Sequence, residues 1–323
     1  MKELLMLKGA RALVDVCARV RGGEDILVVT DMKEKLSIAK AILSIAKDRG
    51  ANINLLVMEP CGSPGQEPSR VVSNAMLGAD VIFCIVSNSI THTYAVKNAA
   101  AKGARIIAMT DFREEMMVSG GIEADFEALR PICKKIAQVF EMGKTLHLTT
   151  PRGTNLVANI EGRRGNALCC IVEPGEFAPV PTVEANVSPV ESSAEGVIVC
   201  DASIPYIGIG LIEEGVILKV EKGMVVEIEG GRQAKVLREN LASYKDKTVY
   251  NVAEIGVGLN PKCRMCGIML EDEGVLSTAH VGIGTNITLG GSIKAPIHYD
   301  LIMWDPCVVV DGEVIISGKD IYV

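Results

Sequence analysis

Val81-Ile82-Phe83-Cys84-Ile85-Val86 is an apolar stretch with no polar interruption. It is far too short to span a membrane and is typical of a strand buried on both faces of a parallel sheet. Further strand-like runs stand at residues 25–30, 52–58 and 105–110, and apolar residues at helical spacing fill residues 5–20 and 33–47. This alternation predicts an α/β N-terminal domain, residues 1–145, with a doubly wound parallel sheet.

The pattern changes after about residue 146. Helical periodicity fades and short β-runs appear between turns, at residues 168–172, 196–200, 215–220, 224–228, 308–310 and 314–316. Asp311-Gly312 between the last two runs is a strong hairpin signal, and residues 234–244 have a helical pattern. We therefore expect a second domain, residues 146–323, that is largely antiparallel α+β.

Composition narrows the function classes. The net charge of −7 and the absence of a basic run give no reason to expect nucleic acid. No glycine-rich phosphate loop follows the first strand, so a nucleotide cofactor is unsupported. The chain opens without a signal-peptide pattern and holds no apolar run of the ~20 residues that a membrane helix needs. We expect a cytoplasmic protein with no membrane partner, whose cysteines, such as Cys84 and Cys200, are thiols in the core.

The most informative polar residues lie in the C-terminal half. In His298-Tyr299-Asp300 the first and third side chains leave the same face of an extended strand, so both can reach one ion. His280 stands among small residues, and Glu254 interrupts an apolar stretch where a lone carboxylate would be costly to bury. With Glu184, these residues form a donor set that suits zinc, manganese, cobalt or ferrous iron. The C-terminal domain is thus the expected metal-binding domain.

Each candidate ligand also has a simpler, non-functional interpretation. An isolated His-x-Asp pair is more often a surface pair, and a lone histidine such as His280 is more often a hydrogen-bonded core residue. Cys263 and Cys266 have redox or zinc spacing, but no second pair completes a zinc site. His92, at the end of a strand-like run, is a candidate to bind substrate or to cap a helix. Aromatic candidates for a stacking pocket are Trp304, Tyr299, Tyr206 and Phe177.

The order and spacing of these residues resemble the aminopeptidase T family of metallopeptidases and their relatives, the 2,5-dihydroxypyridine dioxygenases. The likeness covers most of the chain. It includes residues 22–31, Thr91-His92-Thr93, residues 100–105, Glu184, residues 188–191, Glu254, Thr278-Ala279-His280 and His298-Tyr299-Asp300.

The peptidase resemblance implies a homodimer with two metal ions in each active site. Carried over, it makes Glu184, Glu254, His280, His298 and Asp300 the metal ligands. The implied chemistry is amide hydrolysis by metal-activated water, with either glutamate as the general base. The tyrosine that follows the family's histidine is absent after His280, and Tyr299 is the candidate substitute. We assign substrate binding to His92 and Asn286.

The dioxygenase resemblance implies one ferrous ion held by two histidines and an aspartate. His298 and Asp300 fit that pattern, whereas Glu254 stands where a histidine is expected, and His280 is the remaining imidazole. We therefore expect first a metal-dependent hydrolase of amide bonds, aminopeptidase-like, acting on a small peptide or another small molecule with one or two zinc, cobalt or manganese ions. The alternative is a mononuclear non-haem iron ring-opening dioxygenase. A catalytically silent binding protein is the third reading.

Overall fold

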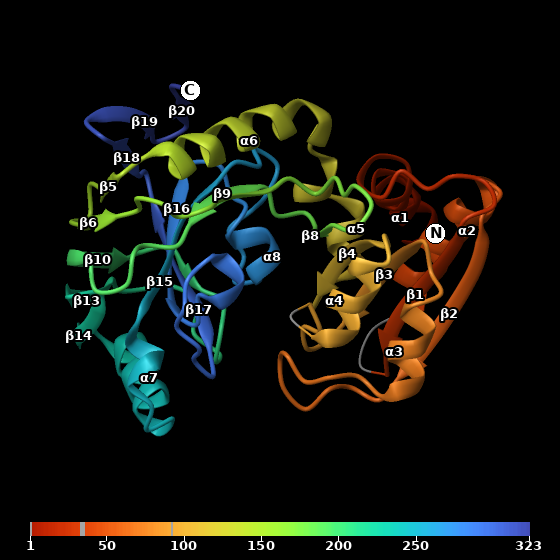
Figure 1. The fold of residues 1–323 in the computed structure, drawn as a ribbon, viewed down its shortest axis with the longest axis horizontal. Coiled ribbons are helices and arrows are strands. Elements are labelled where there is room, and N and C mark those ends of the chain that lie inside the picture. Colours follow the sequence, from red (N-terminus) through yellow and green to blue (C-terminus); the bar gives the residue numbers. More distant parts are fainter. Residues whose placement is uncertain (1, 33–35, 92) are drawn as a thin grey trace. The chain divides into compact units, whose positions relative to one another are not determined.

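The computed structural model describes residues 2–32, 36–91 and 93–323 (Figure 1). The chain divides into two compact units. Unit 1 comprises Met1–Ala128 and Cys169–Pro181, and unit 2 comprises Leu129–Leu168 and Thr182–Val323. Residues 169–181 belong with the N-terminal part, so each unit is made of two separate segments of the chain. The domain boundary expected between residues 145 and 146 stays a prediction.

Unit 1 is built on a parallel sheet of five strands in the order β2-β1-β3-β4-β8. The strands are β1 (Asp25–Asp31), β2 (Asn52–Met58), β3 (Val81–Val86), β4 (Arg105–Thr110) and β8 (Phe177–Pro179). Every residue of β3 is buried, as its uninterrupted apolar sequence predicts. The first four strands lie where the sequence places them, and the predicted doubly wound α/β fold is confirmed.

Successive residues of a strand point to opposite faces of the sheet, so a sheet of apolar strands needs helices packed on both faces. Leu27 and Val29 of β1 pack in one core cluster with Val72 of α3 and Val96 of α4. The described helical elements of this part are α1 (Lys2–Arg11), a π-helical turn at Ala12–Cys17, α2 (Leu36–Asp48), α3 (Arg70–Met76), α4 (Tyr94–Ala101), α5 (Glu114–Val118) and a 3₁₀ turn at Gly121–Glu123. Helix α6 (Phe126–Met142) carries the chain from unit 1 into unit 2.

Unit 2 contains two antiparallel sheets. The first has the order β14-β13-β10-β6-β5-β18-β19-β20 and the second the order β12-β11-β17-β16-β15-β9-β7. The first comprises β5 (Thr145–Thr149), β6 (Asn155–Asn159), β10 (Glu195–Cys200), β13 (Val216–Glu221), β14 (Met224–Glu229), β18 (Cys307–Val310), β19 (Glu313–Ser317) and β20 (Asp320–Ile321). The second comprises β7 (Gly165–Leu168), β9 (Glu184–Val187), β11 (Ser203–Ile204), β12 (Gly210–Leu211), β15 (Val252–Gly258), β16 (Thr278–Gly284) and β17 (His298–Trp304).

Short helical elements complete unit 2: α7 (Arg232–Ser243), α8 (Met269–Asp272) and 3₁₀ turns at Lys247–Tyr250 and Ile287–Leu289. The helix expected at residues 234–244 is therefore confirmed as α7. The predicted hairpin is also present, with Asp311 and Gly312 both at positive φ between β18 and β19, as a tight primed turn requires.

Three expectations need correction or restriction. The strand expected at residues 168–172 is wrong, because β7 ends at Leu168 and the following residues pair with no strand. The helix expected from residue 5 to 20 is broken at Arg11 by a π-helical turn. Residues 33–35, at the start of another expected helix, lie outside the described residues, and α2 begins at Leu36.

Two further observations concern the core and the membrane. Cys84 and Cys200 are buried, as expected of small core residues. Within the described ranges, no helix combines the length and apolar character needed to cross a bilayer.

Candidate metal centre

Strands β15, β16 and β17 are neighbours in one sheet (Figure 1), and their register places the candidate ligands on one face of it. Glu254 of β15 pairs with Gly282 of β16, which in turn pairs with Asp300 of β17. His280 pairs with Gly256, and His298 with Gly284, in the same ladders. Because side chains alternate between faces along a strand, residues separated by two positions share this face. The two histidines and the two acids therefore point to the same side, interleaved with glycines.

Glu184 joins this face from β9, the next strand of the sheet. It pairs with Gly258 of β15, two positions from Gly256 and four from Glu254. The five residues expected as ligands thus come from four adjacent strands, and each is placed by strand register rather than by a loop. The structure brings all five together.

Glycine is required at two of the interleaved positions. A Cβ atom at Gly256 would lie 2.1 Å from Nε2 of His280, and one at Gly282 would lie 2.8 Å from both Nε2 of His298 and Cβ of Glu254. Real Cβ contacts are essentially never closer than 3.0 Å. The missing side chains therefore leave the space that the imidazoles fill.

The donor atoms form two adjacent groups that share Glu254. In one group, Nε2 of His280 lies 3.6 Å from Oε2 of Glu184 and 3.7 Å from Oε1 of Glu254. In the other, Nε2 of His298 lies 2.9 Å from Oε2 of Glu254 and 3.3 Å from Oδ1 of Asp300. All are buried except His298, whose side chain is 26% exposed and gives the site its access to solvent.

Neighbouring groups orient the ligands. The carbonyl oxygen of Thr285 lies 2.8 Å from Nδ1 of His298 and can accept its hydrogen bond, which turns Nε2 toward the carboxylates of Glu254 and Asp300. Asn186 donates to Oε1 of Glu184 at 2.9 Å. The hydroxyl of Tyr206 donates to Oδ2 of Asp300 at 2.7 Å. Glu184 and Asp300 therefore each have one oxygen held by a hydrogen bond and one left over.

The oxygens left over indicate a cation. Oε2 of Glu184 and Oδ1 of Asp300 are buried and accept no hydrogen bond, and Nδ1 of His280 is also buried without a partner. Buried polar atoms nearly always have a hydrogen-bond partner, and burying this cluster without a bound cation would cost folding free energy. Carboxylate oxygens and imidazole nitrogens are ligands that divalent transition metals accept. The buried cluster is consistent with a divalent metal.

Crowding of charge shifts the acid–base properties of the cluster. Burial, opposed by His280 and reinforced by the other acids, raises the pKa of Glu184 to about 7. Burial alone would lower the pKa of His280, but the charges of Glu184, Glu254 and Asp300 raise it to about 9. Burial would likewise raise the pKa of Asp300, but His298 holds it well below its ordinary value. Without a metal, protonated histidines balance the carboxylates.

One implication of the dioxygenase resemblance is not met by the geometry. Among the described residues, each three-residue ligand group contains a single histidine, His280 in one and His298 in the other. A compact set of two histidines and one aspartate is therefore not assembled. The group around His298 instead offers one imidazole and two carboxylates.

The remaining candidate residues have different surroundings. The hydroxyl of Tyr299 donates to Oδ1 of Asn240 at 3.2 Å and lies 3.3 Å from the hydroxyl of Tyr244, at α7 rather than among the carboxylates. The amide of Asn286 is occupied within its own loop by Ser188, Glu191 and the backbone of Ile293. His92 lies outside the described residues. The catalytic role of Tyr299 and the substrate-binding roles of the other two stay predictions.

Sequence reasoning missed the residues that orient the ligands. Asn186 has a usable signal, because it stands two positions from Glu184 on a strand and so shares its face. Tyr206 was named from the sequence only as a candidate for a stacking pocket; it precedes β17 by more than ninety residues, and no sequence pattern links it to Asp300. The alternation of Gly256 with Glu254 and of Gly282 with His280 was readable, since glycine in a strand marks a close approach.

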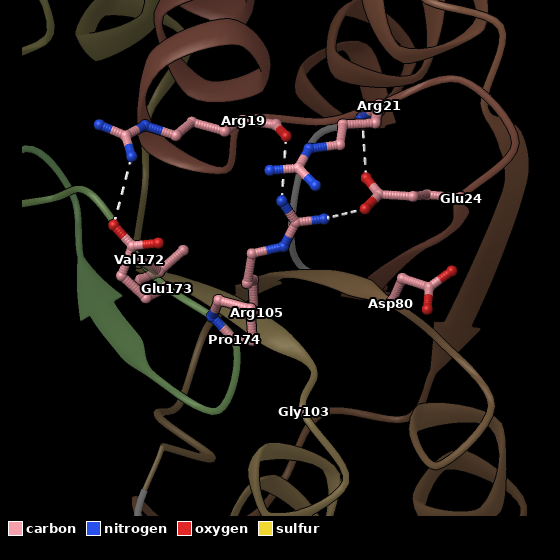
Figure 2. A pocket seen from close by; sticks show the side chains of 9 residues that line it. All are labelled: Arg19, Arg21, Glu24, Asp80, Gly103, Arg105, Val172, Glu173 and Pro174. Atoms are coloured by element: carbon pink, nitrogen blue, oxygen red, sulfur yellow. Dashed lines mark hydrogen bonds and ion pairs between the residues drawn. The ribbon is translucent and has the colours of Figure 1, made fainter.

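Unit 1 contains a separate cavity of about 200 Å³ at the amino ends of β1 and β4. Figure 2 shows that arginines and acids line it together. Arg105 donates to the carbonyl of Arg19 and to Glu24, and Arg19 pairs with Glu173 at 3.2 Å. These charges largely neutralise one another, and the candidate ligands all belong to unit 2.

Comparison with known proteins gives the family. Residues 6–322 match the family model described as 2,5-dihydroxypyridine 5,6-dioxygenase. A curated protein of that name from Pseudomonas putida KT2440 is 29% identical over 161 residues. That match covers 46% of this chain and 45% of the relative's length.

Solved structures share the fold. The structure of a 2,5-dihydroxypyridine dioxygenase from Pseudomonas putida KT2440 aligns with a TM-score of 0.83 at 19% identity, over 100% of this chain and 98% of that one. Wild-type AmpT from Thermus thermophilus aligns over 100% of both chains with a TM-score of 0.71 at 16% identity. The fold is therefore shared with both the dioxygenase structure and the AmpT structure.

These comparisons correct the expected activity. The expectation of an aminopeptidase-like hydrolase of amide bonds is wrong, and the family match supports the ring-opening dioxygenase that stood as the alternative. The error has a physical cause, since carboxylates and imidazoles bind zinc, manganese and ferrous iron alike, so the donor set does not separate hydrolysis from oxygen chemistry. The missing tyrosine after His280 was the signal against hydrolysis. The chain belongs to the 2,5-dihydroxypyridine 5,6-dioxygenase family.

Proposed function

We propose that this protein is a non-haem iron dioxygenase that opens the ring of a small dihydroxylated pyridine, with 2,5-dihydroxypyridine as the first substrate to test. The family match over residues 6–322 carries this proposal. In the reaction that the family's description names, the bond between ring carbons 5 and 6 breaks and both atoms of O₂ enter the product. The expected homodimer remains a prediction.

The cluster on β15, β16 and β17 supports the proposal. Glu254, His298 and Asp300 would hold the ferrous ion, because their donor atoms converge and Oδ1 of Asp300 accepts no hydrogen bond. When bound, iron supplies the one-electron chemistry that lets oxygen react with an electron-rich ring. The partial exposure of His298 gives a small aromatic molecule a route to the ion.

The protein's own residues would then position charge and move a proton. Thr285 fixes the ring of His298 by accepting from Nδ1, so that Nε2 is presented to the ion. Oε2 of Glu184 is free of hydrogen bonds, and burial raises the pKa of this carboxyl to about 7. A carboxylate poised near neutrality is suited to accept the proton of a ring hydroxyl. We assign Glu184 this role of general base and Glu254 that of a ligand.

The test uses protein reconstituted anaerobically with ferrous iron. Addition of oxygenated 2,5-dihydroxypyridine should cause oxygen uptake together with loss of the ring's ultraviolet absorption. His298→Ala should abolish both signals. His147→Ala is the matched control, because His147 lies on β5 and bonds Asn155 instead of the cluster. Iron-loaded protein that consumes no oxygen with this substrate or with related dihydroxypyridines would contradict the proposal.

A further inference from the structure

We propose that Tyr206 is a positioning residue of the metal centre, whose hydroxyl holds one oxygen of Asp300 so that the other faces the ion. The inference rests on the proposed function in one respect, namely that Asp300 is a metal ligand. It assigns a task to a residue that neither the strand pattern nor the family resemblance singled out.

The contact itself is short and directed. Tyr206 donates to Oδ2 of Asp300 at 2.7 Å, while Oδ1 of the same carboxylate is buried without a hydrogen bond and lies 3.3 Å from Nε2 of His298. A carboxylate fixed through one oxygen cannot rotate freely. Its second oxygen is therefore presented in one orientation, which is what a metal ligand needs.

Tyr206 is held in place before any ion arrives. It lies in the turn between β11 and β12, where its backbone N–H donates to Ile204 and its carbonyl accepts from Ile209. Strand β11 pairs with β17 through Ser203 and Ile302, two residues beyond Asp300. The pairing of β11 with β17 therefore fixes the position of the Tyr206 turn relative to Asp300.

Two side-chain contacts fix the same turn. The hydroxyl of Ser203 donates to Oδ2 of buried Asp272 at 2.6 Å. The ring of Tyr206 stacks on that of Tyr299, with centroids 5.0 Å apart and planes 24° from parallel. These contacts hold the tyrosine without using its hydroxyl, which leaves the hydroxyl for Asp300.

The chemical type of the donor also fits the task. Tyr206 is a neutral donor, so it orients Asp300 without cancelling the negative charge that attracts a cation, as a lysine or arginine would. Its oxygen lies 3.0 Å from Oε1 of Glu273 as well. A hydroxyl has one proton to donate, and the shorter distance, to Asp300, indicates where it goes.

The decisive variant is Tyr206→Phe, which removes the hydroxyl and keeps the ring that stacks on Tyr299. Titration of the metal-free protein with Mn²⁺ should show affinity at least about tenfold weaker than that of the wild type, within the range for residues that orient a ligand. The visible absorption bands of the Co²⁺-loaded variant should also shift. Tyr244→Phe is the matched control, since Tyr244 bonds Tyr299 rather than a cluster carboxylate. It should leave both readouts unchanged.

A second variant tests whether the loss of Mn²⁺ affinity comes from the bond to Asp300 and not from the contact of Tyr206 with Glu273. Glu273→Gln keeps the Tyr206 hydroxyl and keeps a hydrogen-bonding side chain of the same size beside Asp300, which Glu273 also contacts, so its Mn²⁺ affinity should stay within a few-fold of the wild type. Equal loss in both variants, or a Tyr206→Phe protein with wild-type affinity and Co²⁺ spectrum, would overturn the inference. So would a wild-type protein that binds no divalent metal. If metal binding behaves as expected but no oxygen is consumed, the proposed reaction fails while the role of Tyr206 stands.

Discussion

Adding one methyl group at Gly282 should damage the metal centre more than the overall fold. The new Cβ would lie 2.8 Å from Nε2 of His298 and from Cβ of Glu254, about 0.6 Å short of the 3.4 Å at which ordinary contact begins. Neither neighbour can yield easily. The His298 ring is held through Nδ1 by Thr285 at 2.8 Å, and Glu254 is fixed in the middle of a buried strand.

Overpacking of this kind costs about 1–3 kcal/mol of stability. Metal sites tolerate displacements of only about 0.2 Å in ligand distances, so the shift that Gly282→Ala forces on His298 should weaken Mn²⁺ binding by about tenfold or more. Isothermal titration of the metal-free protein measures the affinity, and urea unfolding measures the stability.

Gly215→Ala is the matched control in the same unit. Its Cβ would meet nothing closer than 3.6 Å, so both affinity and stability should stay near those of the wild type. A Gly282→Ala protein that folds and binds Mn²⁺ as tightly as the wild type would refute the assigned geometry.

Three other predictions follow from the same cluster. His298→Ala and Asp300→Ala should each remove bound metal while unit 1 stays folded, and unchanged metal content by elemental analysis in both variants would rule out the site. The raised pKa of Glu184, about 7 against an ordinary 4.5, and that of His280, about 9 against 6.5, mean that the metal-free folded protein holds more protons than the unfolded chain in this window. The stability of the metal-free protein should therefore fall as the pH rises from about 4.5 through about 9. Over the same range the Mn²⁺ affinity should rise, because metal binding displaces those protons. Urea unfolding that shows constant or rising stability would contradict the raised pKa values of Glu184 and His280. Chelation should lower the melting temperature of loaded protein, since an ion present at a hundred times its dissociation constant stabilises by about 2.7 kcal/mol, and equal melting curves with and without chelator would count against a folded-state site.

Much of the fold was predictable because its signals are local. The apolar run of β3 and the Asp311-Gly312 turn specify their structure within a few residues. The spacing of His298 and Asp300 on one strand was equally local, and the strand β17 confirms it. Where a short pattern and the packing demand the same geometry, sequence reasoning succeeds.

The rest depends on contacts between distant segments. Strand β8 is only three residues long and completes the unit 1 sheet by pairing with β4, about seventy residues earlier. Tyr206 meets Asp300 only because β11 pairs with β17. No periodicity within either segment contains that information, and register between strands is fixed by the packing of the whole sheet. The reaction was missed for a different reason, since one donor set serves several metals.

The most direct test of the proposed dioxygenase is mass spectrometry of the product formed by iron-loaded protein from 2,5-dihydroxypyridine under isotopically heavy oxygen gas in ordinary water. A dioxygenase gives a ring-opened product that carries both heavy oxygen atoms from one O₂ molecule. A product whose new oxygen comes from water, or recovery of unchanged substrate from iron-loaded protein, would contradict the proposal.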